Sequence, residues 1–275
     1  MKPPAIRLAP GTHTRRCVRQ LDRISTSMAG PITGFTLLLL IWQILALFIE
    51  TIPDPGSTLQ TALALFGNPF PDPATGQTGL GWNILITLER LFTGLALALL
   101  AGFPAGVLLG RLPWLTNVCT PVINLFRHVS PLAWLPFGLL VFNAPESAAV
   151  WTIFVCSVWP LLNNTAEGIR RVPRDYLNLA RTLALPEWKV FTRIILPAAA
   201  PHIVTGLRMS VSGAWLVVVA SEMFIGGEGI GSWLRTALAN LNSEKIVIAI
   251  LLVGTIGLLL DLPLLALRKR LTPKN

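Results

Sequence analysis

Long apolar runs separated by short polar segments dominate the pattern of this chain. Runs with few charges extend over 31–52, 91–110, 121–142, 147–166, 201–225 and 246–267. A helix rises ~1.5 Å per residue, so ~20 apolar residues cross the hydrocarbon core of a bilayer. The pattern therefore predicts an all-α, polytopic membrane helical bundle with about six transmembrane helices.

The polar segments divide the chain in order. We expect a basic tail at 1–28, a first transmembrane helix at 29–52, an outer loop at 53–82, a helical core at 83–270 that contains a charged segment at 166–200, and a C-terminal tail at 271–275. A basic flank before an apolar run also occurs in signal peptides. This run is longer than a signal core and lacks a small-residue cleavage site, so we expect an uncleaved span.

Small residues are frequent in the run 91–110. Gly94, Gly102, Gly106 and Gly110 recur at multiples of four positions. Glycines at this spacing allow two helices to approach closely in a membrane. We therefore expect this helix to pack deep in the bundle or across a subunit contact.

The segment 166–201 is the only long stretch that is both charged and helical in pattern. Its basic residues are Arg170, Arg171, Arg174, Arg181, Lys189 and Arg193. Pro173 suits the first position of one short helix, and Pro186 opens a second helix whose apolar face includes Trp188 and Phe191. Helices this short are unstable alone in water. We therefore predict a helical elbow that lies against an apolar surface.

Composition and charge agree with a membrane protein. Hydrophobic residues make up 53% of the 275 residues and charged residues only 13%, against ~25% charged in soluble domains. The net charge of +9 comes from short basic blocks at the ends of apolar runs, where Lys and Arg set orientation. Both termini and the elbow are therefore expected on the cytoplasmic side, and nucleic acid is not an expected partner.

Several kinds of chemistry lack their sequence signals. The cysteines (Cys17, Cys119, Cys156) and the histidines (His13, His128, His202) show no ligand spacing. The chain contains no GxxxxGK[ST] phosphate loop, and no strand precedes GGEGIG, which we interpret as a tight outer loop. An enzyme site, a metal site and nucleotide binding are therefore not expected.

Polar and aromatic residues inside the apolar runs are candidates for a translocation pathway. The candidates are Arg127, Trp134, Trp159, Asn163, Asn164, Trp215 and Glu222. Arg127 and His128 could hold an anion, or Arg127 could extend to lipid headgroups. The tryptophans could line the pore or pack, and the asparagines could contact substrate or bridge helices. Glu222 would repel an anion, so we interpret it as a gate or a structural partner.

Two further charges lie in the last two runs. Arg208 and Asp261 would neutralise each other, which predicts an ion pair between these spans. Ion-coupled secondary transporters place carboxylates along a midplane relay and often contain inverted repeats, and neither is visible. Such a transporter remains the alternative interpretation.

The elbow resembles the EAA loop of ABC-importer permeases, whose pattern is Glu-Ala-Ala, three residues, Gly, nine residues, Ile, any residue, Leu-Pro. The matching positions are Asn178, Leu179, Ala180, Ala184, Ile194, Leu196 and Pro197, with Asn178 replacing Glu and Ala184 replacing Gly. TLERLFTG, RHVSPLAWLPFG, WPLLNNTAEGI, GLRMSVSGAWLVVVASEM and GGEGIGSW are similar to segments of nitrate, sulfonate, taurine and bicarbonate permeases. The likeness covers about residues 82–270 and is closer to the nitrate, cyanate and bicarbonate branch.

The resemblance implies a type I ABC-importer permease fold in a multi-pass protein of the bacterial inner membrane. Such a subunit translocates a small anionic solute of the nitrate or nitrite, cyanate, bicarbonate or sulfonate class. It has no cofactor of its own, because ATP and Mg belong to cytoplasmic ABC ATPase subunits. The other implied partners are a second permease copy in a homodimer and a periplasmic or lipid-anchored solute-binding protein.

The resemblance also implies that the elbow couples the permease to the ATPase. The implied coupling residues are Asp175, Asn178, Leu179, Ala180, Arg181, Ala184, Leu185, Pro186, Ile194, Leu196 and Pro197. Asp175 could supply the charge missing at Asn178. Because Ala disfavours a left-handed backbone, we expect the bend to move from Ala184 to Leu185 and Pro186.

Overall fold

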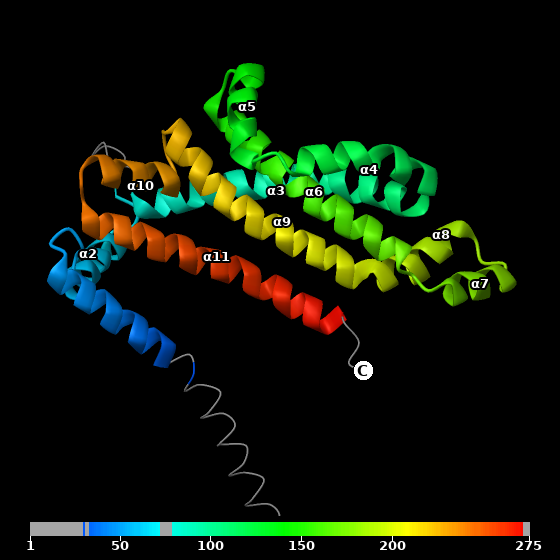
Figure 1. Cartoon of the computed structure of the whole chain (residues 1–275), viewed down its shortest axis with the longest axis horizontal. Helices are drawn as coiled ribbons and strands as arrows, with labels where there is room; N and C mark the ends of the chain where they lie inside the picture. Colours follow the sequence, from blue (N-terminus) through cyan, green and yellow to red (C-terminus); the bar gives the residue numbers. More distant parts are fainter. Residues whose placement is uncertain (1–29, 31–32, 72–78, 272–275) are drawn as a thin grey trace, which may run out of the picture. The chain divides into compact units, whose positions relative to one another are not determined.

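The computed structural model describes residues 30, 33–71 and 79–271, and these residues form helices and connecting turns without a strand (Figure 1). The chain divides into two units, 1–60 and 61–275. The first contains the apolar helix Thr33–Phe48 and the beginning of α2, Pro55–Gly67. The predicted basic tail lies outside the described residues.

The second unit contains the remaining helices. They are α3 (Leu80–Arg111), α4 (Pro113–Arg127), the 3₁₀ turn η2 (Pro131–Ala133), α5 (Trp134–Phe142), α6 (Pro145–Arg170), α7 (Arg174–Thr182), α8 (Glu187–Val190), the π-helical segment η3 (Phe191–Ile195), α9 (Leu196–Ile225), α10 (Ile230–Ala239) and α11 (Ser243–Leu271). The predicted all-α class is therefore confirmed.

Four of the described helices are long and apolar enough to cross a membrane. They are α3, α6, the continuous helix Glu187–Ile225 and α11. The predicted third span is broken, because α4 and the η2–α5 segment meet at 86° and together make a fifth span at most. The bend precedes Pro131, which disfavours a helical backbone at the residue before it. The helix Thr33–Phe48 is apolar but shorter, so six full spans are not seen in the described part.

The small residues of α3 face α6. A Cβ atom added to Gly94 would lie 2.5 Å from the Ile153 side chain, and one added to Gly106 would lie 2.7 Å from the Leu162 carbonyl oxygen. These glycines let the two helix backbones approach closely, as the sequence predicts. The glycines of α3 therefore serve the packing of α3 against α6 within the chain.

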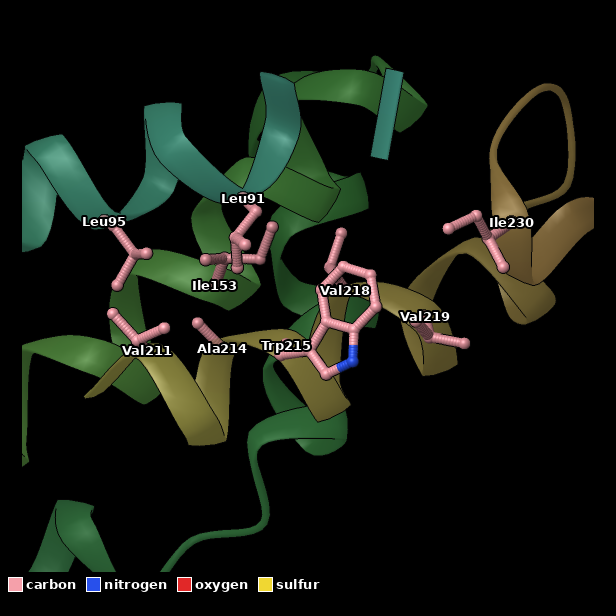
Figure 2. Close-up of a cluster of buried hydrophobic side chains, with 9 residues drawn as sticks. All are labelled: Leu91, Leu95, Ile153, Val211, Ala214, Trp215, Val218, Val219 and Ile230. Atoms are coloured by element: carbon pink, nitrogen blue, oxygen red, sulfur yellow. The ribbon is translucent and has the colours of Figure 1, made fainter. Parts of the chain in front are cut away.

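The largest hydrophobic core joins α3, α6, α9 and α10. Its buried side chains are Leu91, Leu95, Ile153, Val211, Ala214, Trp215, Val218, Val219 and Ile230 (Figure 2). Burial of apolar side chains at this meeting point holds α6 and α9 beside each other. This core thereby positions α6 and α9, which contribute to the cavity and the elbow described below.

Two polar contacts attach α11 to α9. The Arg208 guanidinium donates to both carboxylate oxygens of Asp261 at 2.5 and 2.7 Å, which confirms the predicted ion pair. Trp215 Nε1 donates to the Val253 carbonyl at 2.9 Å. In this pair, each charge neutralises the other, which lowers the cost of placing them in an apolar surrounding.

Candidate functional site

A cavity of about 330 Å³ lies where α4, η2 and α5 meet α6 and α9. It is lined by Arg127, Val129, Pro131, Trp134, Val155, Cys156, Trp159, Pro160, Asn163, Asn164 and Met209. The broken third span supplies one wall, and the middle of α6 supplies most of the other. The cavity therefore brings together the predicted pathway residues of these two elements.

The charge of the cavity lining favours a negatively charged ligand. Arg127 is the charged member of the lining, and it forms no ion pair within the described part of the chain. The Trp134 and Trp159 indole N–H groups are buried without a hydrogen-bond partner there. An indole N–H can only donate, and a buried donor left unpaired costs ~1–3 kcal/mol. These indole nitrogens are enclosed by protein, so an anion in the cavity would be held by the Arg127 guanidinium.

Aromatic packing fixes the broken span against α6. The Phe126 and Trp159 rings are stacked, with centroids 6.3 Å apart and planes 7° apart. Trp134 packs edge-on against Trp151 at 6.5 Å. These contacts hold both walls of the cavity at a set distance.

The predicted helix-bridging role of the asparagines fits Asn164. Its amide nitrogen donates to the Pro160 carbonyl at 2.8 Å within α6 and lies 3.7 Å from the Met209 sulfur on α9. His128 follows the last residue of α4 and does not line the cavity; its Nδ1 lies 2.5 Å from the Asn124 carbonyl oxygen of α4. Arg127 and His128 are therefore not brought together at one site.

Two predicted pathway residues lie outside the cavity. Trp215 is buried in the core (Figure 2). Glu222 is only 1% exposed, and it accepts hydrogen bonds from Thr87 Oγ1 at 2.9 Å, from Arg90 Nη1 at 2.7 Å and from the Gly231 N–H at 2.9 Å. Of the alternatives given for Glu222, this geometry fits a structural partner.

A polar face of α3 organises the corner between α9 and α10. The Gly229 N–H donates to Asn83 Oδ1 at 2.6 Å, and the Ile230 N–H donates to Thr87 Oγ1 at 2.9 Å. These N–H groups begin α10 and have no partner inside that helix. Gly229 has φ +119, and a Cβ there would lie 2.4 Å from the Glu222 carboxylate. GGEGIG thus forms a tight loop around a buried carboxylate.

Sequence reasoning missed Asn83, Thr87 and Arg90, which we call the α3 polar face. All three are buried. We predicted that the second span begins at residue 91, so these positions were placed before the helix. Their spacing of four and three residues was the available signal, because it places polar side chains on one face of a helix.

The first arm of the elbow is α7, which Ala180 and Leu177 attach to the protein. Ala180 is 1% exposed, and Leu177 packs against a buried cluster that includes Ile169 and Ile195. Pro173 lies one residue before the helix, at its N-cap position, and not at the first helical position as predicted. The elbow does lie against an apolar surface, as expected.

The bend of the elbow stays at Ala184, so the predicted shift to Leu185 and Pro186 is wrong. Ala184 has φ 49. Its N–H donates to the Arg181 carbonyl at 3.0 Å, and the Leu185 N–H donates to the Ala180 carbonyl at 3.1 Å. This pair of bonds is the Schellman motif, which requires a left-handed residue after the helix. Satisfying two helix-end carbonyls therefore outweighs the cost of a Cβ in this conformation.

The second arm is not a separate short helix. α8 continues through the π-helical segment into α9, so Ile194, Leu196 and Pro197 lie in a continuous helix rather than in the exposed bend. Phe191 packs inward as predicted, whereas Trp188 is 73% exposed. The protruding part of the elbow is therefore 171–186, shorter than the predicted loop.

Apolar and charged side chains share the exposed face of the elbow. Tyr176, Leu179 (57% exposed), Leu183 and Leu185 are large exposed hydrophobic residues. Asp175, Asn178, Arg181 and Pro186 are exposed beside them. Contiguous exposed apolar residues rimmed by polar ones are typical of a protein interaction site.

Arg111 connects the end of α3 to the second arm, a role that sequence reasoning missed. Its Nη2 lies 3.4 Å from Glu187 Oε2 at the start of α8, and its guanidinium lies 5.1 Å from the centre of the Phe191 ring. The end of α3 is therefore tied to the elbow as well as to α6.

Comparison with known proteins gives consistent matches. Residues 94–274 match the family described as "Binding-protein-dependent transport system inner membrane component". The nitrate import permease protein NrtB of Synechocystis sp. is 37% identical over 253 residues, covering 91% of this chain and 92% of that protein. The bicarbonate transport system permease protein CmpB of Synechocystis sp. is 36% identical over 247 residues, covering 88% of each.

The fold also has counterparts among solved structures. A structure of the MetNI methionine ABC transporter in inward-facing conformations aligns with a TM-score of 0.63 and 16% identity. The alignment covers 70% of this chain and 96% of that chain. At this identity the likeness establishes a shared helical architecture.

Proposed function

The chain belongs to the family of inner-membrane components of binding-protein-dependent transport systems, and we propose that it carries a small inorganic anion through the membrane at the expense of ATP hydrolysed by a partner. One observation carries this proposal. α6 and α9 line the cavity; α9 is continuous with the second arm of the elbow, and α6 is joined to α7, the first arm, by the short turn 171–173. A force on the elbow therefore reaches the cavity directly through the helix Glu187–Ile225 and, across a short turn, through α6.

The cavity supports an anionic solute of the nitrate or bicarbonate class. Related permeases are named for nitrate and for bicarbonate, and both ions are small, singly charged oxyanions. The Arg127 guanidinium in the cavity lining offers a positive charge and hydrogen-bond donors. Asn163 and Asn164 add amide groups on the opposite wall.

The elbow supports docking to a cytoplasmic ABC ATPase. The basic segments and the positive-inside rule favour the cytoplasm for the elbow and for both termini. Leu179, Leu183 and Tyr176 would insert into a groove of the ATPase, while Asp175, Asn178 and Arg181 would form polar contacts at its rim. ATP and Mg would bind to that subunit.

A second copy of the chain would complete the cavity. Arg127 and Met209 are exposed in the single chain, and a guanidinium facing hydrocarbon costs several kcal/mol. A homodimer with the two cavities facing each other would shelter these groups from lipid. A periplasmic or lipid-anchored binding protein would deliver the solute to the outer side.

Reconstitution in vesicles with the partner ATPase and binding protein tests this function. We expect uptake of nitrate or bicarbonate to require ATP and to persist when ion gradients are collapsed. Arg181→Glu should leave membrane insertion intact and reduce uptake at least tenfold, because it reverses a charge on the docking face. Lys245→Glu, a charge reversal in the first turn of α11, is the matched control. Uptake driven by an ion gradient without ATPase would refute the proposal.

A further inference from the structure

Arg90 holds two carboxylates with different sides of its guanidinium group. Nη1 donates to Glu222 Oε1 at 2.7 Å and to the Glu228 carbonyl at 2.7 Å. Nε donates to Glu146 Oε2 at 2.5 Å, and Nη2 donates to Glu146 Oε1. Each guanidinium nitrogen therefore has a partner, and the bond to Glu146 is bidentate.

The two carboxylates differ in burial and in the number of partners. Glu222 is 1% exposed and is also held by Thr87 and Gly231. The Glu146 side chain is 67% exposed, and its hydrogen bonds within the described residues come from Arg90. Loss of Glu146 would leave Arg90 paired with Glu222, whereas loss of Glu222 would open a buried network.

The energies of the two ion pairs differ accordingly. Removing one partner of a buried ion pair costs ~3–5 kcal/mol, because a buried charge remains. The Glu146 side chain is 67% exposed, so water screens this pair and can replace Arg90 as the partner of the carboxylate, which makes it the weaker of the two pairs. Thermal energy or a modest force can therefore open the Glu146 contact while the Glu222 contact persists.

The Glu146 contact lies at the end of α6 opposite the elbow. Glu146 is in the first turn of α6, and the elbow follows Arg170, the last residue of this helix. At 1.5 Å per residue, α6 extends for roughly 36 Å between these points. A tilt of α6 imposed at the elbow moves its first turn relative to Arg90 on α3.

We propose that the Arg90–Glu146 ion pair is a latch that positions the first turn of α6 in the resting permease and opens when the elbow moves. This inference rests on the proposed function. Arg90 and Glu146 act as positioning residues, because neither lines the cavity. The latch keeps α6 in place until the binding protein and the ATPase act together, and so it limits ATP hydrolysis without transport.

Glu146→Gln tests the latch, because it removes the charge and keeps the size of the side chain. The full chain, with its ATPase and binding protein, is reconstituted in vesicles, and ATP hydrolysis is measured with and without binding protein. We expect hydrolysis without binding protein to rise at least threefold and the uptake per ATP to fall. Glu146→Asp keeps the carboxylate and should restore values close to wild type.

Glu244→Gln is the matched control, because Glu244 lies in the first turn of another spanning helix, α11. It accepts a hydrogen bond from Thr61 at 2.6 Å and should leave hydrolysis unchanged. If Glu146→Gln hydrolysed ATP at the wild-type rate without binding protein, the latch would be refuted. The latch would also be refuted if Glu146→Gln and Glu146→Asp both had a lowered melting temperature. Absence of ATP-driven uptake in the wild-type complex would instead refute the proposed function, and the latch with it.

Discussion

Ala184 holds a backbone conformation that glycine adopts at lower cost. Left-handed geometry costs an L-residue ~1–2 kcal/mol, and glycine avoids this cost but loses more entropy on folding. Ala184→Gly should therefore stabilise the bend of the elbow by about 0.5–1 kcal/mol. Hydrogen exchange at the Leu185 amide, which closes the motif, should slow roughly two- to fivefold.

Leu241 provides a matched comparison for this substitution. It has φ 51 and follows α10, and the Asn242 N–H donates to the Ala237 carbonyl at 2.9 Å. Leu241→Gly should slow exchange at Asn242 by a similar factor. Faster exchange at Leu185 in Ala184→Gly would mean that backbone strain does not control the bend.

The pairing of charges inside apolar runs was predictable, whereas the pairing of charges at the ends of runs was not. Arg208 and Asp261 each lie within an apolar span, so pairing was the cheapest solution. Arg90 lies just before the apolar run 91–110, so we predicted that it precedes the second span. Its partner Glu146 is distant in sequence, and only the packing of α3 against α6 and α9 brings them together.

The contact between α3 and α6 depends on the absence of side chains at the α3 glycines. At Gly106 a Cβ would lie 2.7 Å from the Leu162 carbonyl oxygen, and a backbone atom cannot move aside as a flexible side chain can. Gly106→Ala should therefore destabilise the protein by ~1–3 kcal/mol, as overpacking does. The melting temperature of the purified protein in detergent should fall.

Gly254 in α11 is the control for this substitution. A Cβ there would meet nothing within 4 Å. Gly254→Ala should be neutral or stabilising, because Ala is the better helix former by up to ~1 kcal/mol. Equal melting temperatures for Gly106→Ala and Gly254→Ala would contradict close packing as the role of Gly106.

The existence of the spanning helices was predictable from hydropathy, whereas their ends were not. α3 begins at Leu80, although we predicted a start at residue 91, and α8 continues into α9, although we predicted that the fifth apolar run begins at residue 201. Hydropathy reports the apolar part of a helix, but polar ends such as the α3 polar face remain helical because tertiary contacts satisfy their side chains. The third span breaks near Pro131, and the angle of this break depends on aromatic packing against α6.

The cavity and the elbow lie at different points along α6 and α9, so their variants should affect different steps. Arg127→Gln removes the charge that we propose attracts an anion and leaves the proposed docking face of the elbow unchanged. Leu179→Asp places a charge in the apolar docking face and leaves the cavity unchanged. In vesicles, Arg127→Gln should lower uptake at least tenfold while binding protein still stimulates ATP hydrolysis, whereas Leu179→Asp should abolish both.

The control for the elbow is Leu267→Asp, which adds the same charge at an exposed leucine in the last turns of α11. It should leave binding-protein-stimulated hydrolysis intact, because α11 does not form the elbow. If Arg127→Gln abolished stimulated hydrolysis as completely as Leu179→Asp does, the two features would not be separable. The coupling between them would then require an anion in the cavity before the ATPase responds, rather than a mechanical connection through α6 and α9 alone.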